Sequence, residues 1–164
     1  MTEFETEYGS FPNEETAAQI KAKNPRDLHL AAKTSNDVCR QLIASGIVSS
    51  EQIFYAKVKG AQKPDGIITA GEVVKKGECG FSYLSGLSSG GNRSRPLVVT
   101  PLIAGNDRFD PKPFQGKAVI LRMDNSIASL PINEEGHLLV DGVNLLDPRH
   151  PIWGGKPPVI VWPE

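Results

Sequence analysis

The chain is poor in cysteine, in aromatic residues and in net charge. Among its 164 residues there are two cysteines, and 18 lysines and arginines are balanced by 19 aspartates and glutamates. A protein dedicated to nucleic-acid binding normally carries a basic excess or a basic block, so we expect no nucleic-acid partner. No apolar run approaches the ~20 residues of a membrane-spanning helix, and no basic and apolar leader opens the chain. We therefore expect the chain as printed to be soluble.

Motifs that support catalysis are also missing. The three histidines, His29, His137 and His150, have no metal-ligand spacing and are interpreted as solvated loop residues. The glycine- and serine-rich segment 85–91 has neither the strand and helix of a nucleophile elbow nor the lysine of a phosphate-binding loop. We therefore expect a protein without catalytic activity, and a hydrolase that uses His137 or His150 ranks last among the alternatives.

Patterns for a metal ion are weak. Asp124, Ser126 and Glu135 have the spacing of the first, third and last ligands of a calcium-binding EF-hand loop, but Ser129 stands where that loop needs a glycine. The acidic segment 106–110 could hold calcium, and a solvated loop explains it more simply. We expect no cofactor, and calcium remains the open alternative.

The chain does have enough length for one domain, with an uneven distribution of proline. A chain of 164 residues can bury roughly 70% of its unfolded surface around a single core, so we expect one domain over residues 1–164. It contains 16 glycines and 13 prolines, and ten of the prolines follow residue 95. This distribution predicts a helical part over residues 1–48, then strands and long proline- and glycine-rich loops over residues 49–164.

Three helices are predicted in the first part. Residues 1–8 have a helical pattern that a glycine ends, and Asn13 is a good N-cap for a helix over residues 14–23. Ser35 is expected to cap a third helix, which ends before Gly46. The apolar residues of this third helix share one face: Val38, Cys39, Leu42 and Ile43. Because so short a helix is not stable alone, that face must pack against another element.

The second part has the pattern of strands. Residues 52–58 are compatible with a strand or a helical turn, and a long polar excursion follows over residues 59–77. The strand-like runs are 80–84, 96–103, 118–123, 127–132 and 137–140. Asp124-Asn125-Ser126 forms the turn of the clearest hairpin, and Pro131 indicates that its second arm is a sheet edge or is ending. Helices followed by hairpin-linked strands predict an α+β fold, with N-terminal helices packed on an antiparallel sheet.

Cys39 and Cys79 are the candidate site residues that the sequence offers. Their separation excludes a CxxC redox motif and a zinc ribbon. In an oxidising compartment a disulfide between them would close ~40 residues and contribute about 4 kcal/mol in the chain-entropy model. Alternatively, Cys39 is an ordinary core residue of its helix and Cys79 lies beside a strand start. We favour two separate cysteines, and the disulfide is the alternative.

The segment Phe4 to Pro12, Phe-Glu-Thr-Glu-Tyr-Gly-Ser-Phe-Pro, resembles the end of the long N-terminal helix of type IV pilin-like proteins. In that family, which includes the pseudopilins of type II secretion, an aromatic and acidic stretch leads into Tyr-Gly-x-Phe/Tyr-Pro. The helix predicted from Ser35 resembles the family's short second helix. The hairpin over residues 119–127 resembles the family's strand–Asp-Gly-Ser–strand hairpin, with Asn125 in place of the glycine.

The resemblance implies a pilin-like headpiece that lacks the family's basic leader, processing site and apolar membrane helix. It implies a structural protein without catalysis or a cofactor. The full-length form would be anchored in the inner membrane and then packed into a periplasmic or cell-surface filament. Its partners would be other pilin-like subunits and the assembly machinery. The family's calcium loop has no matching residues in this chain, so the resemblance assigns no metal ligand.

A secreted or periplasmic binding module, for a glycan for example, is the alternative function. Trp153 and Trp162 would then be stacking platforms in the tail over residues 141–164. Tryptophans near a terminus more often anchor such a tail to the domain, and we expect this tail, with its five prolines, to wrap over the surface. The filament subunit is therefore the first interpretation.

Overall fold

In the computed structural model, residues 1–24, 28–69, 73–88 and 90–164 are described. The helical elements of these residues are α1 (Thr2–Tyr8), α2 (Glu14–Lys23), α3 (Ser35–Ala44) and two short 3₁₀ helices, η1 (Glu51–Phe54) and η2 (Pro151–Trp153). The strands are β1 (Ser82–Ser85), β2 (Pro96–Thr100), β3 (Lys117–Arg122), β4 (Ile127–Pro131), β5 (Leu139–Val140), β6 (Val143–Asn144) and β7 (Val159–Val161).

Five of the strands form one antiparallel sheet in the order β4-β3-β2-β1-β7, and β5 pairs with β6 in a separate hairpin. The predicted α+β class, with helices followed by an antiparallel sheet, is confirmed. Pro131 ends β4, which is an edge strand, and this agrees with the interpretation of that proline. Proline has no N–H to donate, so an edge is where a sheet accepts it.

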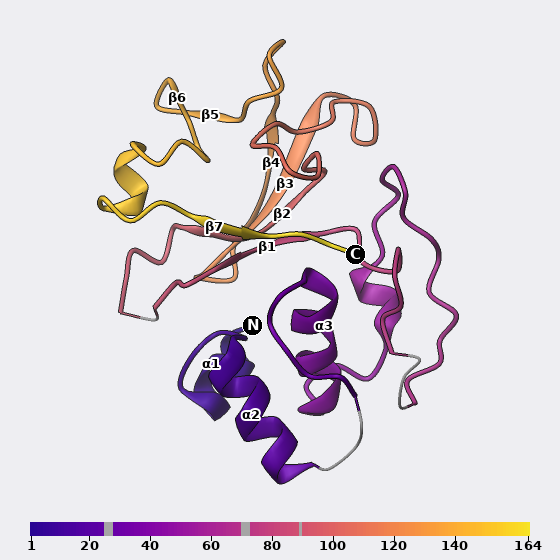
Figure 1. The fold of residues 1–164 in the computed structure, drawn as a ribbon. Helices are drawn as coiled ribbons and strands as arrows, with labels where there is room; N and C mark the ends of the chain where they lie inside the picture. The colour runs from indigo at the N-terminus through magenta and orange to yellow at the C-terminus, as the bar shows by residue number, and fades with distance from the viewer. Residues whose placement is uncertain (25–27, 70–72, 89) are drawn as a thin grey trace.

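The sheet lies between two unlike layers (Figure 1). The helices α1, α2 and α3 cover one face, whereas the loops that carry β5, β6 and η2 cover the other. On β1, Tyr83 faces the helices and Leu84 faces the loops, as the two-residue period of a strand requires. The loop-side core is the larger of the two sheet cores and includes the buried ring of Trp153.

An irregularity in β2 alters this alternation. The pairing of β2 with β3 shifts between Pro96 and Val98, and as a result Leu97 packs in the helix-side core while Val99 packs in the loop-side core. A β-bulge places two residues of one strand opposite one residue of its neighbour. The residues before and after Val98 can therefore be buried on opposite faces of the sheet. Both Leu97 and Val99 are completely buried.

The helix boundaries largely follow the predicted caps. The side chain of Asn13 accepts the N–H of Thr16, and the Thr16 side chain accepts the N–H of Asn13, which forms a capping box at the start of α2. The prediction that Ser35 caps α3 was wrong by one residue, because the capping side chain is that of Thr34. The Ser35 hydroxyl instead donates to the Val161 carbonyl and accepts the Tyr83 N–H.

Of the two interpretations of residues 52–58, a strand or a helical turn, the structure has the helical turn, because the segment begins within the 3₁₀ helix η1. One further prediction changed in the structure. The tail does not simply wrap over the surface, because its residues Val159–Val161 form β7, the second edge strand of the sheet. The proline-rich composition hid this strand, which is only three residues long. Trp153 does anchor the tail, since its side chain is 1% exposed and its Nε1–H donates to the Leu145 carbonyl.

Tyr83 connects the sheet to the helical layer, and its ionisation should control stability in alkaline solution. Its hydroxyl donates to the Pro12 carbonyl at 3.0 Å, and burial raises the pKa of Tyr83 well above its ordinary value. In the unfolded chain the phenol ionises near pH 10. The folded state therefore binds more protons above that pH, so the free energy of unfolding should fall as the pH rises from 10 to 11.

Replacing Tyr83 with Phe isolates this contribution. At pH 8 the substitution should lower the free energy of unfolding by about 1 kcal/mol, because the Pro12 carbonyl loses its donor. By pH 11 the wild-type protein alone should have lost about 1.4 kcal/mol, since only its unfolded chain gains the ionised phenol, so the difference between the two proteins should vanish or reverse its sign. Urea unfolding curves at both pH values measure this change, and a difference independent of pH would contradict it.

Candidate functional site

An apolar groove of about 350 Å³ is the candidate functional site. Its floor is formed by sheet residues on the helix side: Val98, Val119, Leu121 and Ile127. Its wall is the apolar face of α3, with Val38, Cys39 and Leu42. Met1, at the start of α1, and the η1 residues Ile53 and Phe54 also line it.

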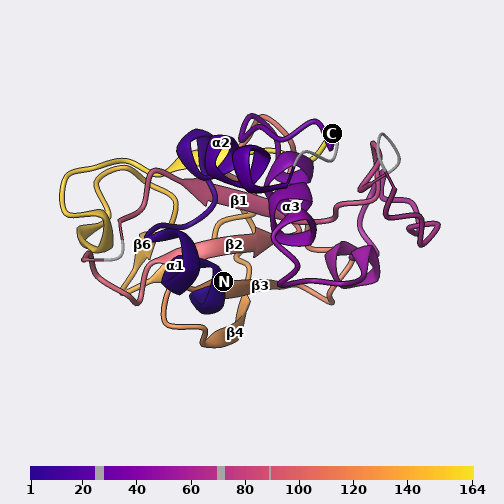
Figure 2. The same ribbon diagram turned by 90° about the horizontal axis from the view of Figure 1, so that it is seen from below.

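The groove exists because the helices cover the sheet unevenly. Figure 2 shows α2 and α3 lying over β1, while β3 and β4 extend beyond them. On β3 the loop-side residues Ala118 and Ile120 are completely or almost completely buried, whereas the helix-side residues Val119 and Leu121 are partly exposed. On the edge strand, Ile127 is 72% exposed. The sheet therefore presents an apolar surface that is continuous with the core.

The lining of the groove is mostly apolar, and the hydroxyl groups in it are already hydrogen-bonded within the chain. The two hydroxyl groups that line it are those of Ser35 and Tyr83, and both already make hydrogen bonds to carbonyl groups of the chain. A hydroxyl acts as a nucleophile only when a base can take its proton, and each of these protons is donated to a backbone carbonyl instead. This surface therefore favours an apolar partner, because binding such a partner would remove apolar area from water.

The two candidate cysteines meet at the edge of this groove. The Sγ atoms of Cys39 and Cys79 are 3.7 Å apart, and the side chains are 7% and 3% exposed. Burial raises the pKa of the Cys39 thiol, so it is protonated at neutral pH. The structure thus brings together two residues that the sequence analysis favoured as separate, because the long excursion after η1 returns the chain to α3.

The histidines do not converge on a site within the described residues. His29 is exposed and His137 is partly exposed, but the prediction that His150 is a solvated loop residue was wrong, because it is 4% exposed. Its Nδ1 accepts the Ile152 N–H and caps η2, so its Nε2 carries the proton and donates to the Val140 carbonyl. The ring has a structural role that the sequence did not signal.

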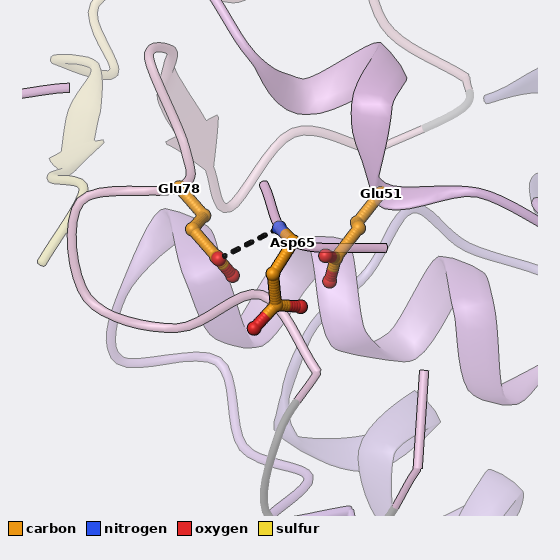
Figure 3. Close-up of side chains that lie close together, drawn as sticks. All are labelled: Glu51, Asp65 and Glu78. Carbon is orange, nitrogen blue, oxygen red and sulfur yellow. Dashed lines mark hydrogen bonds between the residues drawn. The ribbon is translucent and has the colours of Figure 1, made fainter. Parts of the chain in front are cut away.

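Sequence reasoning missed a cluster of three carboxylates, Glu51, Asp65 and Glu78 (Figure 3). One oxygen from each lies within 4.8 Å of the others. Glu51 is completely buried and Glu78 is 5% exposed, whereas Asp65 is exposed. Their spacing fits no metal-binding motif, and the only sequence signal was the turn that contains Asp65.

The two buried carboxylates organise the loop around them. The Glu51 oxygens accept the N–H groups of Gly66 and Val74 at 2.7 and 3.1 Å. The Glu78 oxygens accept those of Asp65 and Lys75 at 3.3 and 2.6 Å. These bonds replace the backbone pairing that a loop lacks, and they explain the burial of both acids.

The exposed Asp65 completes the cluster through an ion pair. Its Oδ2 lies 2.7 Å from Lys75 Nζ, and this hydrogen bond lowers the pKa of the Asp65 carboxyl. The sequence-predicted calcium pattern lies elsewhere: Asp124 Oδ1 accepts the Ser126 N–H in the β3–β4 turn, and Glu135 belongs to the following loop. Neither Asp124 nor Glu135 belongs to a cluster of potential metal ligands among the described residues.

Comparison of the chain with protein-family models, with curated proteins and with solved structures gives no match. Within the part of the chain that the structure describes, none of the helices has the length and apolar character needed to cross a membrane.

Removing the charge of Glu51 should destabilise the domain. Glu51→Gln places an amide group against a backbone N–H that now donates to a carboxylate oxygen, so we expect a loss of about 2–3 kcal/mol in the free energy of unfolding. Asp65→Asn is the matched control, because its exposed ion pair with Lys75 should matter far less. Chemical denaturation measures both variants, and equal effects would contradict the organising role of Glu51.

Proposed function

We propose that this chain is the headpiece of a pilin-like filament subunit, a structural protein without catalytic activity. The observation that carries the proposal is the apolar groove, which Met1 lines at the start of α1. In the full-length subunit, an apolar helix that leads into α1 would lie along the groove. This arrangement would explain why the partly exposed apolar groove lies beside the start of α1.

The floor of the groove suits a helix. A helix satisfies its own backbone hydrogen bonds, so it needs only apolar contacts from the surface that receives it. The four floor residues are a leucine, an isoleucine and two valines, and the wall adds the apolar face of α3. Figures 1 and 2 both show the N-terminus at the end of α1 that is nearer to α3. A helical continuation from this point would begin beside the groove, because Met1 lines it.

The α1 helix is firmly attached to the rest of the domain. Phe4 and Tyr8 belong to the core of the helical layer, and Glu5 forms an ion pair with Arg93 at 3.1 Å. Arg93 also donates to the Met123 carbonyl at the end of β3. These contacts connect α1 rigidly to the sheet. A helix that continues α1 outside the domain would therefore be attached firmly to the headpiece.

The resemblance of residues 4–12 to the end of the pilin-like helix supports the same function. The proposal places the full-length protein in the inner membrane before assembly, and in a periplasmic or cell-surface filament afterwards. Its partners are other pilin-like subunits and the assembly machinery. The face of the headpiece away from the groove, formed by the loops with β5 and β6, is then free for contacts with neighbours.

The alternative of a binding module receives less support. Trp153 is buried, with its indole N–H already bonded to the Leu145 carbonyl, so its ring is not a surface stacking platform. Trp162 is partly exposed, and its carbonyl accepts the Ser35 N–H. One partly exposed ring is a weak basis for glycan recognition, and we do not propose it.

The native form of the protein tests the proposal directly. We expect the protein isolated from cell membranes to be several kilodaltons heavier than the 17.7 kDa chain. The N-terminal sequence of this form should begin with a methylated aromatic residue and a long apolar run of ~20 residues. Intact mass and N-terminal sequencing measure both features. A native soluble protein that begins at or near Met1 would overturn the filament function.

A substitution in the groove should have different effects in the two forms. In the 164-residue chain Ile127 is 72% exposed, so Ile127→Asp should change the free energy of unfolding by less than about 1 kcal/mol. In the membrane-derived protein the same carboxylate would be buried against the apolar helix, and its cost should rise to several kcal/mol. Protein level and filament yield should then fall sharply.

Val159→Asp is the matched control for this comparison. Val159 is 57% exposed and lies on β7, at the opposite edge of the sheet from β4. It should leave stability and assembly nearly unchanged in both forms. Equal behaviour of the Ile127 and Val159 variants in the membrane-derived protein would show that no helix occupies the groove.

A further inference from the structure

We propose that Cys39 and Cys79 form a disulfide bond when the protein is in an oxidising compartment. The Sγ atoms are 3.7 Å apart, and a disulfide requires ~2.05 Å, so a movement of about 1.7 Å would close the bond. Cys39 lies on α3, whereas Cys79 lies in the segment that leads into β1. The two side chains therefore already meet across the packed interface of the helical layer.

Other roles for this pair require groups that the structure does not supply. A zinc site needs further ligands, and among the described residues no third potential metal ligand joins the two cysteines in a cluster. An activated nucleophile needs a nearby base or cation. The Arg40 guanidinium, whose charge acts on both thiols, already bonds to Asp37 and to the carbonyls of Val73 and Val74.

Apart from the end of α3 and η1, the described residues that the disulfide would enclose form no helix or strand. The bond would span 40 residues, including η1, the three carboxylates and the long loop between them. Restricting such a loop lowers the entropy of the unfolded chain and so stabilises the folded one. Both cysteines also line the apolar groove, so the bond would hold its α3 wall to the segment that leads into β1.

The reaction is thiol–disulfide exchange with a low-molecular-weight or protein disulfide as the oxidant. One cysteine thiolate attacks a sulfur of the oxidant, forms a mixed disulfide and releases one thiol. The second cysteine then attacks the sulfur of the first, and the second half of the oxidant leaves as a thiol. Two protein thiols lose two electrons and two protons in total, and the oxidant is reduced to two thiols.

The test uses the 164-residue chain equilibrated with oxidised glutathione. We expect its intact mass to fall by ~2 Da, with no alkylation of either cysteine after unfolding without reductant. Peptide mapping should recover the peptides of Cys39 and Cys79 as one linked species. Adding a phosphine reductant should lower the melting temperature by roughly 10 °C, as the loop length implies.

Three variants distinguish the effect of the disulfide on stability from the effect of core packing: Cys39→Ala, Cys79→Ala and the double variant. Each substitution changes core packing, but none of the three proteins should show a melting temperature that depends on the reductant. The inference is wrong if both wild-type thiols remain open to alkylation in the oxidising buffer and the reductant leaves the melting temperature unchanged. The filament proposal does not enter this test, because every measurement is made on the printed chain.

Discussion

The start of α3 is hydrogen-bonded to the seam between β1 and β7, and the arrangement of the helical layer depends on this attachment. The Ser35 hydroxyl donates to the Val161 carbonyl and accepts the Tyr83 N–H, while the Ser35 N–H donates to the Trp162 carbonyl. Residues from three distant parts of the chain thus meet at one point, where Ser35, Tyr83 and Val161 are all buried. Because this point lies near one edge of the sheet, the helices cover that side and leave the apolar surface of the β3–β4 side accessible.

The proposed function and the proposed disulfide both follow from that asymmetry. A helix packed over the middle of the sheet would have buried Val119 and Leu121 and left no groove for an apolar partner. With α3 near the edge, Cys39 instead contacts the segment before β1, and its Sγ atom lies 3.7 Å from that of Cys79. The long loop between η1 and β1 then needs internal support, and Glu51 and Glu78 provide it by accepting four backbone N–H groups.

Local features of the fold were predictable wherever neighbouring residues decide them. Short-range hydrogen bonds and the geometry of single residues decide three such features: the Asn13 cap, the hairpin turn at Asn125 and the edge position that Pro131 indicated. The errors arose where distant residues compete for the same group. Ser35 has a side chain that can cap a helix, but its hydroxyl is hydrogen-bonded to the Val161 carbonyl of β7. The neighbouring Thr34 caps α3 instead.

The sequence by itself determined the α+β class, the helical first part and the main hairpin, because periodicity and turn chemistry are properties of adjacent residues. Tertiary structure alone decided that three residues of a proline-rich tail complete the sheet, that His150 is buried, and that Cys39 meets Cys79. It also gathered Glu51, Asp65 and Glu78 from positions with no shared motif. Such contacts join residues far apart in the chain, and no local pattern records which of them the folded backbone brings together.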